Sequence, residues 1–267
     1  MSAPLQFPQI SSNLIEIGPF VIRWYALAYI AGLLLGWQVL RRLVGMAPVV
    51  ASKEQADDYL TWATLGVVLG GRIGYVLFYQ PTRFLAAPLE AFAVWQGGMS
   101  FHGGLLGVVL ATIWFCNRNV IPVLGFGDRL AVGVPIGLFF GRLANFINGE
   151  LWGRPAAESV PWRMVFPHVD ALPRHPSQLY QALLEGLALF VLMWVLSRRD
   201  NLRARLGFLT GVFAAGYGVA RITGEFFRQP DAFLGFLYAG ATMGQLLSIP
   251  MVLIGIWLML RTDKIAA

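Results

Sequence analysis

Two pairs of polar residues lie inside apolar stretches of the sequence, where such side chains are rare. Arg142 and Asn145 stand three residues apart in the run GRLANFINGELWG, and Arg221 and Glu225 stand four apart in YGVARITGEFFRQPD. Residues at these spacings share one face of a helix. Guanidinium groups match phosphate oxygens bidentately, and a water-poor site strengthens that attraction. The two arginines therefore predict a binding site for a phosphate group.

A phosphodiester held by two arginines can be a cargo or a leaving group. If it leaves a carbon atom, the arginines stabilise the charge that develops on its oxygens. No serine stands in a G-x-S-x-G context, so we expect the nucleophile to belong to a second substrate. His102 is the expected proton acceptor, because it is the only histidine in an apolar stretch and a neutral imidazole suits base catalysis near pH 7. A purely structural Arg221–Glu225 pair and a structural His102 remain alternatives.

The composition places these residues in a membrane. Of the 267 residues, 57% are hydrophobic and 13% are charged, which is about half of the roughly 25% charged residues of soluble domains. A soluble domain of this length cannot hide so much apolar surface. The net charge of +6 comes from basic residues between the apolar stretches. We therefore predict an all-α polytopic membrane protein whose partner is the lipid bilayer, and no nucleic-acid partner.

Seven apolar stretches have the length of about 20 residues that a membrane-spanning helix needs. They cover residues 20–40, 58–79, 99–117, 129–148, 177–197, 206–227 and 240–260. We expect one membrane domain over 1–267, with the hydrophilic connection 149–176 outside the bilayer. If the N-terminus is outside, eleven Lys and Arg residues fall in the inner loops and tail and five in the outer loops. Because inner loops are rich in Lys and Arg, the expected topology has the N-terminus outside and the C-terminus inside.

This topology brings the polar residues of five spans to the outer half of the bilayer. Tyr25 lies near the outer end of the first span, Arg72 in the outer half of the second, and His102 in the first turns of the third; the fourth and sixth carry the two pairs described above. The inner halves carry almost nothing comparable. Ionisable groups at membrane depth are costly and usually mark a functional cavity. As alternatives, Arg23 can extend to the interface and Tyr25 can belong to an aromatic belt.

Other membrane functions fit these residues less well. A metal-dependent phospholipid transferase needs a cluster of aspartates, but Asp57 and Asp58 are a lone pair at the inner end of the second span. A serine protease needs Ser and His face to face, and Ser100 and His102 are two residues apart. The single cysteine, Cys116, rules out an internal disulfide and a Cys-based zinc site. We expect no metal. A protein that binds or transports anionic lipids of the outer leaflet is the alternative to an enzyme.

Several runs of the sequence resemble those of the bacterial prolipoprotein diacylglyceryl transferases. The run GRLANFINGELWGRP at 141–155 is similar to the signature of that family, and four shorter runs follow in matching order: RWYALAY (23–29), SFHGG (100–104), HPSQLYQ (175–181) and RxxxEFFRQPD (221–231). The resemblance implies an inner-membrane enzyme with its active site toward the periplasm and no cofactor. Such an enzyme moves the diacylglyceryl group of phosphatidylglycerol to the lipobox cysteine of a prolipoprotein signal peptide. A thioether forms and glycerol phosphate leaves, which is the first step of lipoprotein maturation.

The resemblance also implies roles for individual residues. Arg142 and Arg221 match essential arginines, which we expect on the phosphate of phosphatidylglycerol. Tyr25 matches an essential tyrosine, and His102 matches a histidine proposed to accept the thiol proton.

Four further positions match the family. We expect Asn145 to hydrogen-bond the headgroup or the signal-peptide backbone and Gly153 to permit a turn. Glu150 and Glu225 are expected to orient the arginines. Whether Arg72 or Arg228 joins the phosphate site is left open by the sequence.

Overall fold

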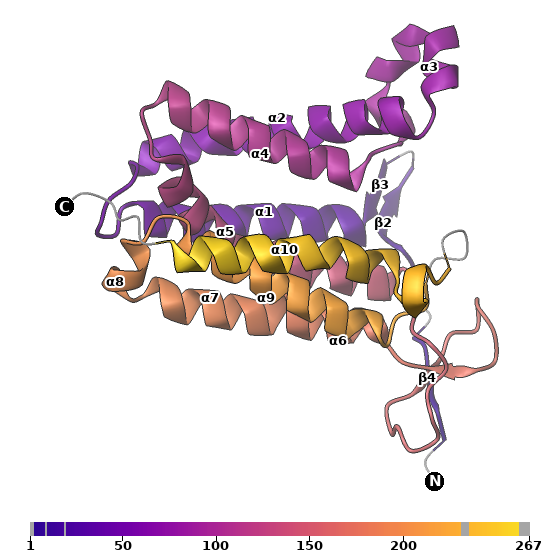
Figure 1. Cartoon of the computed structure of the whole chain (residues 1–267). Helices are drawn as coiled ribbons and strands as arrows, with labels where there is room; N and C mark the ends of the chain where they lie inside the picture. The colour runs from indigo at the N-terminus through magenta and orange to yellow at the C-terminus, as the bar shows by residue number, and fades with distance from the viewer. Residues whose placement is uncertain (1–2, 9, 19, 231–234, 262–267) are drawn as a thin grey trace. The chain divides into compact units, whose positions relative to one another are not determined.

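The computed structural model describes residues 3–8, 10–18, 20–230 and 235–261 (Figure 1). The chain forms two compact units: unit 1 consists of Met1–Leu40 with Asp128–Ala267, and unit 2 of Arg41–Gly127. The single domain over 1–267 therefore stays a prediction, and each unit is described by itself.

Within the described residues, five helices are long and apolar enough to cross a membrane, in agreement with a polytopic membrane protein. They are α1 (Trp24–Val44), α2 (Lys53–Phe78), α5 (Val123–Ile147), the continuous run Ser177–Ser197 and α10 (Met243–Leu260). The run Ser177–Ser197 consists of α6 (Ser177–Gln181), the π-helical η3 (Ala182–Ala188) and α7 (Leu189–Ser197). Helices α4 (Phe101–Arg118) and α9 (Phe208–Glu225) occupy the two remaining predicted stretches. The count of seven spans stays a prediction.

The sequence suggested that Arg23 lies inside the first helix, but the structure places it before that helix. It ends strand β3 (Phe20–Arg23), which pairs antiparallel with β2 (Asn13–Ile17), and α1 begins only at Trp24. The β-branched and apolar residues of this stretch are typical of strands as well as of membrane helices. Because the strand and the helix form one continuous apolar stretch, the sequence pattern does not show where one ends and the other begins.

A buried charged pair lies near the start of α5, where the sequence led us to expect an inner loop. Asp128 and Arg129 are both fully buried inside the helix. The Asp128 carboxylate accepts hydrogen bonds from the backbone N–H groups of Gly207 (2.8 Å) and Thr210 (2.7 Å). Because Gly207, the N-cap of α9, has no side chain, Asp128 satisfies N–H groups that a helix start leaves unpaired. The start of this helix, which the predicted topology places in the inner half of the bilayer, therefore carries two ionisable groups.

Unit 2 is built on the antiparallel contact of α2 with α4. A capping box between Ser52 and Gln55 starts α2. Glycines on both helices let the backbones approach closely: a Cβ atom at Gly107 would lie 2.9 Å from Cα of Gly70, on the other helix. The connection between the helices contains α3 (Pro81–Ala86), η1 (Pro88–Phe92) and η2 (Val94–Gln96).

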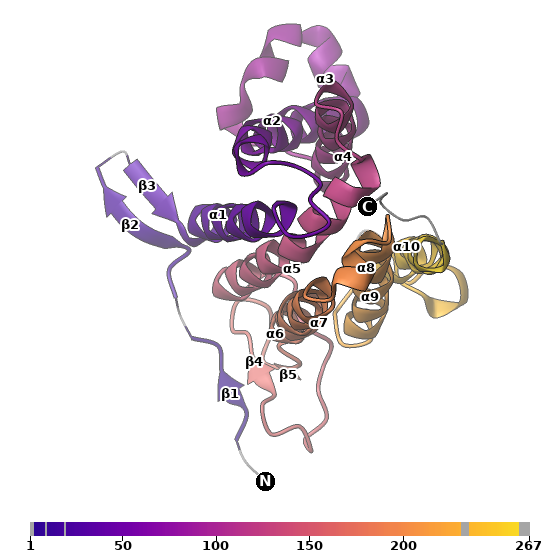
Figure 2. The same ribbon diagram turned by 90° about the vertical axis from the view of Figure 1, so that its left-hand side faces the viewer.

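Unit 1 contains a second glycine contact, between α9 and α10, which lie side by side (Figure 2). A Cβ atom at Gly211 would lie 2.6 Å from the carbonyl oxygen of Gly255. Outside the long helices, β4 (Met164–Val165) pairs with β1 (Leu5–Gln6) and β5 (Pro173–Arg174). The remaining short elements are α8 (Asp200–Arg203) and η4 (Tyr238–Gly240).

The glycine contact in unit 2 predicts that Gly107→Ala separates α2 from α4. Overpacking of a tight contact costs about 1–3 kcal/mol, so the variant should melt at a lower temperature. Cys116, the single cysteine, is buried, and its reaction with a maleimide during heating reports the change. The control is Gly137→Ala, because a Cβ atom at Gly137 meets nothing within 4 Å. Equal reaction temperatures for both variants would contradict the packing argument.

Candidate active site

Two arginines from different helices meet around one buried carboxylate. Glu185, on η3, is fully buried, and its Oε2 accepts hydrogen bonds from Nε (3.0 Å) and Nη2 (2.9 Å) of Arg142. Nη1 of Arg221 lies 3.6 Å from Oε1 of the same residue. The structure thus brings together the two arginines that the sequence singled out. The sequence analysis missed Glu185, although a lone acidic residue in an apolar stretch is the same signal as a lone arginine.

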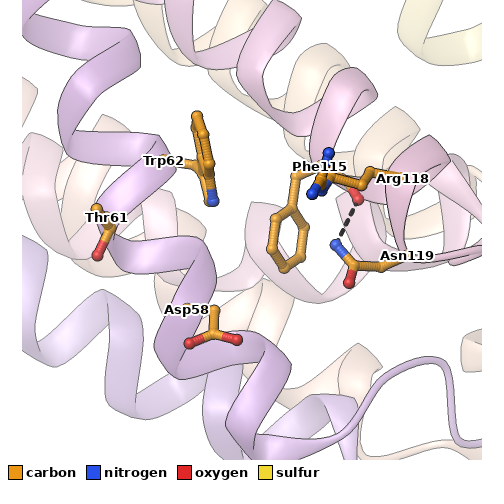
Figure 3. Close-up of a pocket in the computed structure, with 6 residues that line it drawn as sticks. All are labelled: Asp58, Thr61, Trp62, Phe115, Arg118 and Asn119. Carbon is orange, nitrogen blue, oxygen red and sulfur yellow. Dashed lines mark hydrogen bonds between the residues drawn. The ribbon is translucent and has the colours of Figure 1, made fainter.

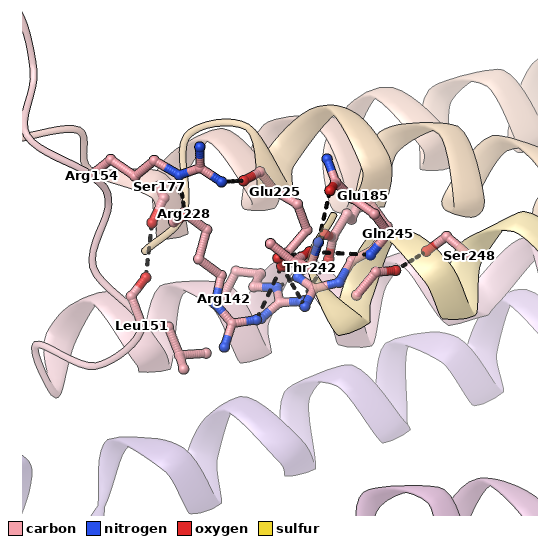
Figure 4. A network of polar contacts seen from close by, with 12 residues as sticks. Arg142, Leu151, Arg154, Ser177, Glu185, Glu225, Arg228, Thr242, Gln245 and Ser248 are labelled. Atoms are coloured by element: carbon pink, nitrogen blue, oxygen red, sulfur yellow. Dashed lines mark hydrogen bonds and ion pairs between the residues drawn. The ribbon is translucent and has the colours of Figure 1, made fainter. Parts of the chain in front are cut away.

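A second carboxylate extends this cluster, as Figure 4 shows. Glu225 pairs with Arg221 at 2.8 Å, which confirms the predicted contact four residues apart, and with Arg228 at 3.3 Å. Its other oxygen accepts a hydrogen bond from Oγ1 of Thr242 (2.6 Å), the N-cap of α10. Arg228 therefore joins the cluster through Glu225, which contacts two arginines, and the orienting role expected for Glu225 stays a prediction.

Among the described residues, three guanidinium groups of this cluster face two carboxylates. Arg142 donates to Glu185 through two of its nitrogens, and among the described residues its Nη1 has no hydrogen-bond partner. Nη1 of Arg221 is buried and makes no hydrogen bond within the described part of the chain. Tyr217, on α9, interacts electrostatically with both arginines. We will call Arg142, Glu185, Arg221, Glu225 and Arg228 the arginine cluster.

Asn145 joins Tyr25 to Glu150. Its Nδ2 donates to Oη of Tyr25 and to Oε2 of Glu150 (3.2 Å), and Nδ2 of Asn148 donates to the other oxygen of Glu150 (3.1 Å). Glu150 therefore orients two asparagines and no arginine, which corrects the role expected for it. An ionised carboxylate only accepts hydrogen bonds, so the amide nitrogen of Asn145 must face Glu150. Since the Tyr25 oxygen already accepts from Asn145, its own hydrogen is available to another acceptor.

Gly153 lies where three segments of the chain converge, and it does not form the turn that the sequence suggested. Its N–H donates to the carbonyl of His175 (3.0 Å), and it forms a β-bridge with Arg228. A Cβ atom at Gly153 would lie 2.7 Å from the carbonyl oxygen of Phe227. Glycine is required for close approach. The positive φ angles of this loop belong to Gly149 (67°) and Leu151 (57°).

The same convergence places Arg154, which the sequence analysis did not select. Its Nε donates to the carbonyl of Arg228 and its Nη2 to that of Glu225, both at 3.0 Å. These carbonyls lie at the end of α9, where a helix leaves acceptors unpaired. Arg154 therefore positions the backbone that carries two members of the arginine cluster (Figure 4).

The HPSQLYQ run attaches α6 to this loop. Oγ of Ser177 donates to the carbonyl of Leu151 (2.8 Å), and Nε2 of Gln178 donates to that of Glu150 (2.5 Å). Trp162 donates to Oη of Tyr180 (2.6 Å), which lies 3.1 Å from Nδ1 of His175. The Tyr180 oxygen can accept from Trp162 and still either donate its hydrogen to His175 or accept from it. Burial lowers the pKa of His175, which favours its neutral form.

The remaining predicted residues lie in unit 2. His102 is in the first turn of α4, with its exposed ring edge-on to Phe101, and its part in the reaction stays a prediction. Ser100 caps α4 by accepting a hydrogen bond from the N–H of Gly103 (3.1 Å). Arg72 is buried and donates to the carbonyls of Glu90, Ala91, Gly97 and Gly98. It holds the 90–98 segment in place, and its nitrogens are occupied.

Comparison with known proteins agrees with the expected family over almost the whole chain. The family model of prolipoprotein diacylglyceryl transferase matches residues 12–261. The chain is similar to the phosphatidylglycerol–prolipoprotein diacylglyceryl transferase of Gluconacetobacter diazotrophicus, with 61% identity over 96% of this chain and 91% of the relative. The enzyme of the same name from Azospirillum brasilense is 59% identical, covering 97% of both chains. That of Paramagnetospirillum magneticum is 57% identical over the full length of both.

The arginine cluster predicts that Glu185→Gln destabilises unit 1. The substitution leaves the Arg142 guanidinium without its carboxylate, and removal of one partner of a buried pair costs about 3–5 kcal/mol. The midpoint of thermal unfolding, followed by circular dichroism in detergent, should fall. In the control, Glu90→Gln, the ion pair with Arg83 is exposed, and such pairs contribute about 1 kcal/mol or less. Equal midpoints would mean that Glu185 is not the counter-charge of the arginines.

Proposed function

The chain belongs to the prolipoprotein diacylglyceryl transferase family, and we propose on that basis how its arginine cluster carries out the transfer. The protein is a transferase that moves the diacylglyceryl group of phosphatidylglycerol to a prolipoprotein. The acceptor is the thiol of the lipobox cysteine in the signal peptide. A carbon–sulfur bond forms as the bond between the diacylglyceryl carbon and the phosphate oxygen breaks. Glycerol phosphate leaves with the electron pair, and the thiol proton passes to a base.

The observation that supports this role is that Arg142 and Arg221 each keep a guanidinium nitrogen without a hydrogen-bond partner among the described residues. Arg142 and Arg221 bind the phosphate of phosphatidylglycerol through nitrogens that make no hydrogen bond to Glu185 or Glu225. As the carbon–oxygen bond breaks, negative charge grows on the phosphate oxygens, and fixed guanidinium groups stabilise that charge without reorganising. The two carboxylates hold the guanidinium planes in place before the lipid binds.

Tyr25 and Asn145 orient the substrates beside this cluster. The Tyr25 hydroxyl accepts from Asn145 and keeps its own hydrogen for an oxygen of the headgroup or of the signal-peptide backbone. Glu150 fixes the Asn145 amide, and Gly153 allows the loop to approach the end of α9. Residues that set orientation in this way lower the entropic part of the barrier.

We further propose that the protein spans the inner membrane seven times, with its N-terminus and active site toward the periplasm. The seven long helices occupy the predicted stretches. The helices α4, α7 and α10, which run inward in this topology, each end with an arginine over the ring of a tryptophan four residues earlier. Arginine near cytoplasmic helix ends and tryptophan at the interface are both expected there. The pattern supports the orientation.

The reaction is tested with purified protein, phosphatidylglycerol and a lipobox peptide, with or without its cysteine. We expect a diacylglyceryl adduct only on the cysteine peptide, with one glycerol phosphate released per adduct.

Arg142→Lys and Arg221→Lys should each slow the transfer about 100-fold or more, because a point charge cannot reproduce the bidentate fork. Arg83→Lys, at an exposed ion pair, is the control. Transfer at the wild-type rate by either cluster variant would remove the phosphate role, and saturable lipid binding without any adduct would indicate a lipid-binding or transport protein.

The role of His102 is tested by His102→Gln, which keeps a similar shape but cannot take a proton. The rate of transfer should fall about 100-fold, while the affinity for phosphatidylglycerol stays unchanged. Peptides with thiols of different pKa distinguish the alternative. If the variant turns over normally and its rate depends steeply on the thiol pKa, the arginines activate the thiol and His102 is not the base.

A further inference from the structure

A cavity of about 300 Å³ lies in unit 2 between the start of α2 and the end of α4 (Figure 3). Its walls combine both signs of charge with aromatic rings: Asp58, Thr61 and Trp62 come from α2, and Phe115, Arg118 and Asn119 from α4. It shares no residue with the arginine cluster, and the transfer reaction does not use it.

The two charged residues of this cavity have no ion-pair partner among the residues that the structure describes. Both Asp58 and Arg118 are exposed, and no carboxylate lies within 4.0 Å of Arg118. The neighbouring Asp57, in contrast, pairs with Arg41 at 3.0 Å. One carboxylate and one guanidinium that do not bond to each other complement a ligand that carries both an ammonium group and a phosphate.

The surroundings of the cavity follow the polarity of a phospholipid from headgroup to chains. The rings of Trp62 and Trp114 lie 4.2 Å apart, and the Arg118 guanidinium lies 5.5 Å from the Trp114 ring. Tryptophan and arginine favour the interfacial depth of a membrane. Beyond the rings, exposed leucines continue along both helices at helical spacing: Leu65 and Leu69 on α2, and Leu110 and Leu106 on α4.

We propose that this cavity binds a zwitterionic phospholipid of the ethanolamine type. Arg118 binds its phosphate, Asp58 binds its ammonium group, and its acyl chains lie along the exposed leucines. An anionic phospholipid such as phosphatidylglycerol would leave Asp58 without a partner, so the site prefers the zwitterionic headgroup. In the topology proposed above, this lipid comes from the cytoplasmic leaflet.

Native mass spectrometry of the delipidated full-length protein, titrated with phosphatidylethanolamine, tests the proposal. We expect Asp58→Asn and Arg118→Gln each to weaken the binding of this lipid about fivefold, the range of a partly exposed ion pair. Each control removes one charge of the same sign: Glu54→Gln, on the first turn of α2, and Arg198→Gln, which lies over Trp194 at the same 5.5 Å and is not among the residues that line this cavity. Neither control should change the affinity.

Two measurements on the unmodified protein keep the test independent of folding. Phosphatidylcholine, whose ammonium group has no N–H to donate, should bind about fivefold more weakly than phosphatidylethanolamine, and equal binding would overturn the assignment to Asp58. Free phosphoethanolamine bound as tightly as the lipid would overturn the lipid assignment. Unchanged affinity in both cavity variants would overturn the site itself. Both cavity variants should transfer the diacylglyceryl group of phosphatidylglycerol in detergent at the wild-type rate. A failure of the cavity proposal can therefore be distinguished from a failure of the proposed function.

Discussion

The contact between Arg142 and the buried Glu185 is the constraint on which the rest of the site depends. Two guanidinium groups cannot share a site of low dielectric without a counter-charge. Glu185 supplies it from the π-helical segment η3, and π-helical turns often occur at functional sites. The next residue, Gly186, allows η3 to approach α5 closely, since a Cβ atom there would lie 2.7 Å from Cα of Phe139. Helix packing and charge neutralisation are thus achieved by adjacent residues.

A second set of contacts fixes the other end of the cluster through the backbone. Thr242 caps α10 and at the same time donates to Glu225, so the start of one helix is tied to the end of another. Arg154 satisfies carbonyls at the end of α9, and Gly153 permits that approach. The arginines are therefore held by three elements that are distant in sequence: η3, the loop that contains Arg154, and the start of α10. A rigid frame of this kind is what electrostatic stabilisation of a leaving group requires.

The sequence predicted the elements with strong signals. Long apolar stretches located the five helices that can cross a membrane as well as α4 and α9, and the cost of ionisable groups in a membrane selected Arg142 and Arg221. Glu185 was missed because the selection started from the arginines, although Gln181 stands four residues before it in the same apolar stretch. The role of Gly153 was misassigned because a glycine needed for close approach and one needed for a turn look alike in a sequence. The strands β1, β4 and β5 have two residues each, too few for a period to be recognised.

Arg72, which is buried, and Arg142, which is half-buried, differ in which of their nitrogens their partners leave available, and this difference separates a structural position from the proposed phosphate-binding one. Arg72 donates to four backbone carbonyls, so its nitrogens are occupied by the segment it holds. Arg142 concentrates two nitrogens on a single carboxylate oxygen and keeps another without a partner in the described structure. One carboxylate neutralises the charge of a guanidinium group through two hydrogen bonds. Neutral carbonyls stabilise the same charge only when they accept hydrogen bonds from most of its nitrogens. A guanidinium that must later bind a phosphate therefore needs an acidic partner, and in a membrane that partner must be buried with it.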